Sequence, residues 1–126
     1  MLVLETLHGL RVIAAPASLD GVRWSEGTIV LRFAPDEAFA LGATEVQIPD
    51  EYAIVVHESA FVGSWLTREE LADSVLPHIE WPLPERRPSL AQGFVAGVPA
   101  KLWLDGDRAL LLCAAAYVHE LADRLG

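Results

Sequence analysis

Hydrophobic and polar residues alternate most regularly near residue 30, where the chain predicts a strand. Ile29, Leu31 and Phe33 are separated by single residues within 28–33, which is the period of a strand with one buried face. A Pro-Asp-Glu turn follows, and the short apolar stretch at 38–41 ends at a glycine. This spacing predicts a hairpin of two antiparallel strands.

Other apolar stretches predict additional strands with less regular patterns. The run YAIVVH at 52–57 is continuous and β-branched, which is typical of a central strand covered on both faces. The dipeptide Asp105-Gly106 lies between two apolar stretches and predicts a second hairpin. Residues 17–26, which contain Asp20-Gly21, are expected to form a turn. The remaining predicted strands lie at residues 10–15, 44–48, 92–96, 99–104 and 108–113.

Two segments have the spacing of helices. Thr67 and Glu70 form a capping-box pattern at the start of 66–76, and apolar residues then recur on one helical face. Residues 114–125 repeat apolar side chains at helical spacing before Gly126. The pattern predicts the α+β class: an antiparallel or mixed sheet with two main helices packed on one side, in a single domain over 1–126.

The charge of the chain excludes two classes of partner. Eighteen acidic residues against nine basic ones give a net charge of −9, so we expect no binding to nucleic acid and none to an anionic membrane surface. No basic residue occurs between Arg32 and Arg68. This acidic stretch is either a solvated face that maintains solubility or a surface that attracts a basic partner.

The single cysteine and the N-terminal residues favour a cytoplasmic protein. Cys113 lies within an apolar run and is expected to be a buried, unreactive thiol, and no disulfide within the chain is possible. The first residues lack the basic region of a signal peptide, and no uncharged apolar run is long enough to span a membrane.

No group of residues has the pattern of an active site. His57, Glu58 and Ser59 lie at the end of the apolar run at 52–57; His57 and Ser59 could share a face of that strand, but no nucleophile elbow accompanies them. His119 and Asp123 are four residues apart on a predicted helix, without the second histidine of a zinc-protease motif. We therefore predict no catalytic, cofactor-binding or metal-binding residues, and no activity of the chain on its own.

Tryptophan and arginine are the residues most enriched in the centres of protein interfaces. Trp81 lies between prolines and is followed closely by Arg86 and Arg87, while Trp103 is on the opposite strand face from its two leucine neighbours. Packing in or near the core is the ordinary role of such tryptophans. The alternative is that these four residues contact a partner protein.

The order of features over residues 55–125 resembles a known family. The pieces that resemble it are VVHES at 55–59, the helix at 68–76, IEWPL at 79–83 and LAQGFVAGVPAKLW at 90–103; upstream, LRFAPDE at 31–37 is also similar. Together they resemble the γ subunit of heterotetrameric sarcosine oxidase, in the folate-binding aminomethyltransferase (glycine-cleavage T protein) superfamily.

The resemblance implies an accessory subunit. Such a chain has the α+β fold of the superfamily, binds no flavin itself, and packs against larger flavin-dependent subunits of an amine oxidoreductase. Two alternatives stay open: a small acidic protein-interaction module of regulatory or immunity type, and a binder of folate or another small ligand with the same fold.

Overall fold

Backbone contacts divide the chain into two compact units. The computed structural model describes residues 2–126. The inserted unit comprises Leu7–Ser59, and the terminal unit comprises residues 2–6 together with Ala60–Gly126. Both boundaries fall inside a strand, within β1 (Glu5–Ile13) and within β4 (Ile54–Thr67), and neither falls in a linker. The single-domain organisation over 1–126 stays a prediction.

The inserted unit is built on the hairpin expected from the sequence. Strands β2 (Ile29–Ala34) and β3 (Glu37–Leu41) pair antiparallel, which confirms that prediction, and β3 also pairs antiparallel with β1. The strand order continues from β1 to β4. A methyl group built on Gly9 of β1 would lie 2.3 Å from the carbonyl oxygen of Ala40, so only glycine allows β1 and β3 to approach this closely.

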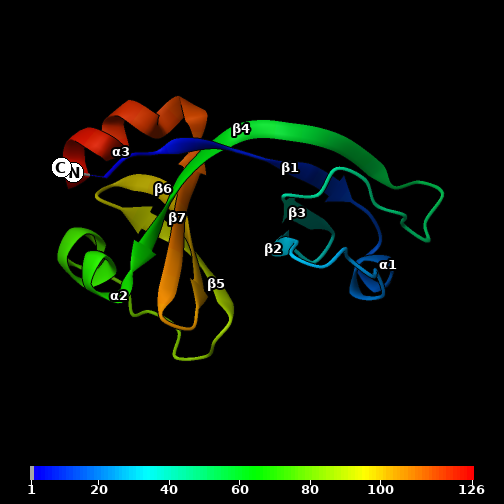
Figure 1. Ribbon diagram of the computed structural model, residues 1–126, viewed down its shortest axis with the longest axis horizontal. Helices are drawn as coiled ribbons and strands as arrows, with labels where there is room; N and C mark the ends of the chain where they lie inside the picture. Colours follow the sequence, from blue (N-terminus) through cyan, green and yellow to red (C-terminus); the bar gives the residue numbers. More distant parts are fainter. Residues whose placement is uncertain (1) are drawn as a thin grey trace. The chain divides into compact units, whose positions relative to one another are not determined.

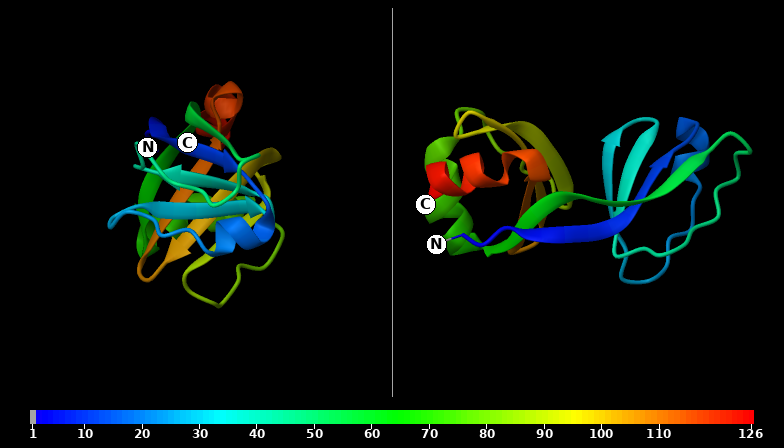
Figure 2. Two further views of the ribbon diagram at one scale, coloured as in Figure 1. Left: turned by 90° about the vertical axis from the view of Figure 1, so that its right-hand side faces the viewer. Right: turned by 90° about the horizontal axis from the view of Figure 1, so that it is seen from above.

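The turn expected at 17–26 begins instead as a short helix, α1 (Pro16–Asp20). Proline occupies the first helical turn, where its missing N–H costs nothing. The right-hand view of Figure 2 shows α1 (blue) beside the β2–β3 hairpin (cyan). The strand expected at 44–48 does not form, so that prediction was wrong. Val46 and Ile48 still pack against the core of the unit, because alternating burial needs no strand partner.

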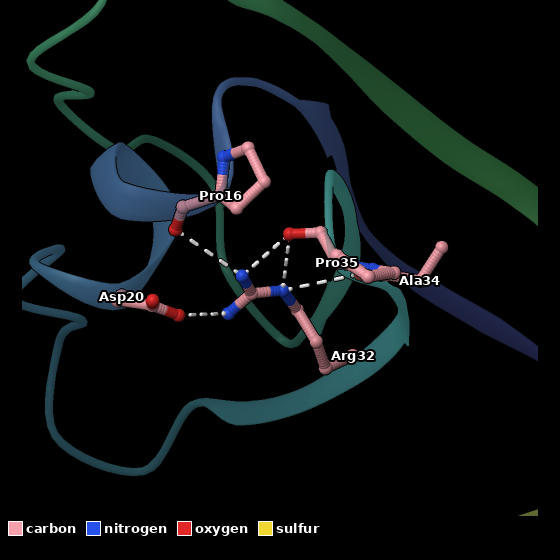
Figure 3. Close-up of polar contacts among 5 residues, drawn as sticks. All are labelled: Pro16, Asp20, Arg32, Ala34 and Pro35. Carbon is pink, nitrogen blue, oxygen red and sulfur yellow. Dashed lines mark hydrogen bonds and ion pairs between the residues drawn. The ribbon is translucent and has the colours of Figure 1, made fainter.

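Arg32 joins the β2–β3 turn to α1 (Figure 3). Its guanidinium donates hydrogen bonds to the carbonyl oxygens of Ala34 (3.2 Å), Pro35 (2.5 Å) and Pro16 (3.3 Å). It also lies 2.9 Å from a carboxylate oxygen of Asp20. Arg32 therefore forms its ion pair and its hydrogen bonds within the inserted unit.

The terminal unit contains a four-stranded antiparallel arrangement in the order β4-β7-β6-β5 (Figure 1). Its other strands are β5 (Ser89–Val95), β6 (Val98–Asp105) and β7 (Arg108–Ala114). The hairpin expected at Asp105-Gly106 is confirmed, but its loop is one residue further on, because Asp105 pairs with Arg108. Gly106 has a φ of 59°, a conformation that favours glycine at the first position of a tight turn.

Two helical segments complete the terminal unit, and both were expected. The first comprises α2 (Arg68–Glu70), the π-helical η1 (Leu71–Val75) and the 3₁₀ turn η2 (Leu76–His78); the second comprises η3 (Ala115–Tyr117) and α3 (Val118–Leu125). The capping box is present: the Thr67 hydroxyl accepts the amide N–H of Glu70 (3.1 Å), and the Glu70 carboxylate accepts that of Thr67 (3.0 Å). The α+β class is confirmed, with antiparallel registers, and each expected helix is a succession of short helical elements of different type.

The core of the terminal unit forms between one face of its strands and these helical segments. Val75 and Leu121 are completely buried against leucines of β6 and β7. Cys113 is also buried, as expected, and burial raises the pKa of its thiol. Because a thiol must ionise to react, Cys113 is chemically quiet in the folded chain. No helix within residues 2–126 is long and apolar enough to cross a membrane.

Candidate functional site

The first half of β4 exposes an apolar strand on both of its faces. β4 begins at Ile54, but its pairing with β7 begins only at Phe61, opposite Ala114. We call residues 54–57 the open half of β4. Ile54, Val55 and Val56 are 54%, 41% and 47% exposed. Successive side chains of a strand point to opposite faces, so both faces carry exposed aliphatic groups.

This exposure corrects the prediction of a central strand covered on both faces. The strand expected at 52–57 is present from Ile54 onward, yet residues 54–57 are all exposed. A sequence pattern shows which side chains favour burial, but not whether the same chain buries them. Contiguous exposed apolar residues of this kind usually mark an interaction site. The open half of β4 is therefore the candidate functional site.

Carboxylates lie directly before the open half of β4. Asp50 accepts the amide N–H groups of Ala15 and Tyr52, both at 2.9 Å, and these hydrogen bonds lower the pKa of Asp50. Asp50 therefore stays ionised to a lower pH than an ordinary aspartate. Glu51 is exposed beside it. The approach to the site is negatively charged.

The whole inserted unit has an excess of acidic residues. Between residues 7 and 59 there are eight acidic residues and three arginines. Two of the arginines are in ion pairs within the unit, Arg32 with Asp20 and Arg11 with Glu37 (2.5 Å) and Glu58 (3.5 Å). The surface of the unit is consequently attractive to cations.

Residues 57–59, weighed from the sequence as a catalytic group, line a small hollow within the inserted unit. The hollow has a volume of about 240 Å³ and is also lined by His8 and Thr44. Glu58 is held near Arg11, which gives its carboxylate a structural ion pair. Across residues 2–126, no three His, Cys, Asp or Glu side chains are grouped as metal ligands. His119 and Asp123 therefore have no third such residue beside them.

Trp81 is a structural residue of the terminal unit as well as a predicted contact. Its indole N–H donates to the carbonyl oxygen of Phe94 at 2.9 Å. A methyl group built on Gly93 would lie 2.7 Å from the indole nitrogen, so the ring lies directly on this glycine. Trp81 also packs against the core of the unit. The Trp81 ring therefore packs directly against the backbone of β5 at Gly93.

The four residues predicted to bind a partner do not form one surface. Trp103 points away from the core-facing leucines of β6, and Trp81 packs on the core side of the sheet. Arg86 and Arg87 are exposed in the loop before β5, where Arg87 donates to the carbonyl oxygens of Pro84 and Arg86. The contact role of Trp81, Arg86, Arg87 and Trp103 stays a prediction.

A second hollow lies beside Trp65 on β4 and has a volume of about 470 Å³. The Arg108 guanidinium lies 4.1 Å from the centre of the Trp65 ring, and Arg108 also lies 3.4 Å from Asp105. Such a cation–π pair stabilises by about 0.5–1 kcal/mol at an exposed site. No local pattern predicts this pair, because the pairing register of β4 with β7 brings the two residues together.

Comparison with known proteins identifies a similar fold. No protein-family model matches the chain, and no match is found among curated proteins. Among solved structures, the chain is similar to a chain of heterotetrameric sarcosine oxidase from Corynebacterium sp. U-96, in complex with pyrrole 2-carboxylate. The TM-score is 0.67 at 21% sequence identity, and the match covers 98% of this chain and 80% of that chain. The resemblance to the sarcosine oxidase γ subunit is confirmed at the level of the fold.

Proposed function

We propose that this protein is a non-catalytic accessory subunit of a heteromeric, sarcosine oxidase-like amine oxidoreductase. The observation that carries the proposal is the match of 98% of the chain to one chain of a heterotetrameric oxidase. In this role the protein contributes binding surface, and larger flavin-dependent subunits contribute the chemistry. We place this role in the cytoplasm, as expected from the N-terminal residues and the single cysteine.

The exposed strand supports an assembled state. Full burial of a Val or Ile side chain contributes about 1.5–3 kcal/mol relative to full exposure. Ile54, Val55 and Val56 are each roughly half exposed, so a covering partner would gain on the order of 2–4 kcal/mol from these three residues. An isolated chain lacks this stabilisation, whereas a chain that is permanently assembled with a partner gains it.

Purification from the native host tests the proposal. The chain would carry a C-terminal affinity tag and be isolated under mild conditions, followed by size-exclusion chromatography with detection of flavin absorbance. We expect the chain to elute with larger subunits that contain flavin, and the pool to oxidise a secondary amine. Elution of the tagged chain alone, in a host that expresses it at its natural level, would contradict the proposal.

A further inference from the structure

Within residues 2–126, the ladder between β4 and β7 ends at Phe61, so β7 leaves the open half of β4 without a partner on that side. β7 pairs with β4 from Phe61 to Thr67, and β4 extends back to Ile54 beyond the last residue of β7. On its other side, β4 is next to β1 in the strand order. A strand edge left in this way presents backbone N–H and C=O groups that can pair with another chain.

We infer that the open half of β4 accepts one added strand from a partner polypeptide. This partner strand has aliphatic residues at alternate positions and lysine or arginine where it passes Asp50 and Glu51. The inference rests on the proposed function, since it describes how the larger subunit is held. Backbone hydrogen bonds supply affinity in strand addition, and alternate side chains supply specificity.

The composition of the partner strand follows from its surroundings. Ile54 and Val56 point to one face and Val55 to the other, so aliphatic groups of an added strand find apolar neighbours on either face. The pKa of Asp50 is lowered by two backbone N–H groups, and Glu51 is exposed beside it. Opposite charges across a strand pair stabilise it and like charges destabilise it. A basic residue therefore fits at this end of the edge and an acidic one does not.

The edge strand of the terminal unit, β5, differs in its side chains and its charge. β5 ends the strand order, so its outer edge is also open, while its inner edge pairs with β6 from Ser89 to Val95. Its exposed apolar residue is Phe94, and the loop before it carries Arg86 and Arg87. A basic strand is attracted to β4 and not to β5. This contrast supplies a control.

Synthetic peptides test the inference on the purified full-length chain. The probe is a fluorescein-labelled peptide of alternating valine and lysine, and its matched controls replace lysine by glutamate or the central valines by proline. We expect the valine–lysine peptide to bind at least about tenfold more tightly than either control, since proline cannot extend a strand ladder. Amide hydrogen exchange at residues 54–57 is expected to slow on binding.

Three variants locate the binding. Val56→Lys is expected to weaken binding of the valine–lysine peptide about tenfold or more, whereas Phe94→Lys, the same change on β5, leaves it unaltered. Glu51→Lys is expected to reverse the preference toward the valine–glutamate peptide. Circular dichroism confirms that each variant is folded. Equal binding of the two charged peptides, or binding insensitive to Val56→Lys, would overturn the inference.

The inference and the proposed function fail differently. If the complex with flavin-containing subunits purifies but Val56→Lys assembles as well as the unmodified chain, the added strand is wrong and the accessory role stands. If the chain purifies alone yet binds the valine–lysine peptide at β4, the accessory role is wrong. Sedimentation of a dimer that Val56→Lys abolishes would show that a second copy uses this edge, and it would also overturn the inference.

Discussion

Replacing Gly93 by alanine tests how tightly Trp81 is packed in the terminal unit. The new methyl group would lie 2.7 Å and 2.8 Å from two atoms of the indole ring, well inside ordinary contact. The ring must move, and that movement breaks the 2.9 Å hydrogen bond from Trp81 to the carbonyl of Phe94. Overpacking costs about 1–3 kcal/mol and a lost hydrogen bond about 0.5–1.5 kcal/mol, against a gain of about 0.5–1 kcal/mol from replacing glycine within a strand.

Gly93→Ala is therefore expected to lower the free energy of unfolding by about 2–3 kcal/mol. Urea denaturation followed by far-UV circular dichroism measures it, and with a slope of about 2 kcal/mol/M the midpoint falls by about 1–1.5 M. In a Trp81→Ala background the same change has room and is expected to be neutral or slightly stabilising. An equal loss in both backgrounds would refute the packing argument, as would a loss below about 0.5 kcal/mol in the intact chain.

Four other predictions concern single side chains. Thr67→Ala removes the helix cap and is expected to destabilise the terminal unit by about 1 kcal/mol in urea titrations. Hydrogen bonds from Thr67 lower the pKa of Glu70, so its stabilising effect is present above the ordinary glutamate pKa and is lost as the pH falls through the lowered value; Glu70→Gln should flatten that acid-side dependence. Cys113 should react with maleimide at the rate of a buried thiol in the folded chain and rapidly in urea, as mass spectrometry would show. The buried indole N–H of Trp103 has no acceptor within residues 2–126, so Trp103→Phe is expected to cost less stability in urea than Trp81→Phe, whose N–H is hydrogen-bonded.

Local patterns along the chain predicted most of the fold. The β2–β3 hairpin and the capping box at Thr67 depend on residues within a few positions of one another, and both form as expected. The strand expected at 44–48 shows the limit of such patterns. Its alternate residues Val46 and Ile48 do pack inward, but a strand also needs a neighbour with free backbone groups, and this one finds none.

The candidate site could not be predicted from the sequence, because local patterns do not show where a strand loses its partner. The run at 52–57 was expected to be covered on both faces, because β-branched residues on both sides of a strand normally pack within one chain. Where β7 ends is decided by pairing with a segment more than fifty residues away, and Phe61 opposite Ala114 is the last pair. The pattern identified the side chains that seek burial. Only the pairing register shows that they are left open.

The carboxylates before the open half of β4 affect how readily the isolated chain aggregates. An apolar strand edge is a template for stacking identical copies edge to edge, and natural proteins guard such edges with charge. When two copies of the chain stack at this edge, Asp50 and Glu51 of one copy come near acidic residues of the other. The two negatively charged chains then repel each other. Concentrated salt would screen this repulsion, so the isolated chain is best protected from aggregation at modest ionic strength.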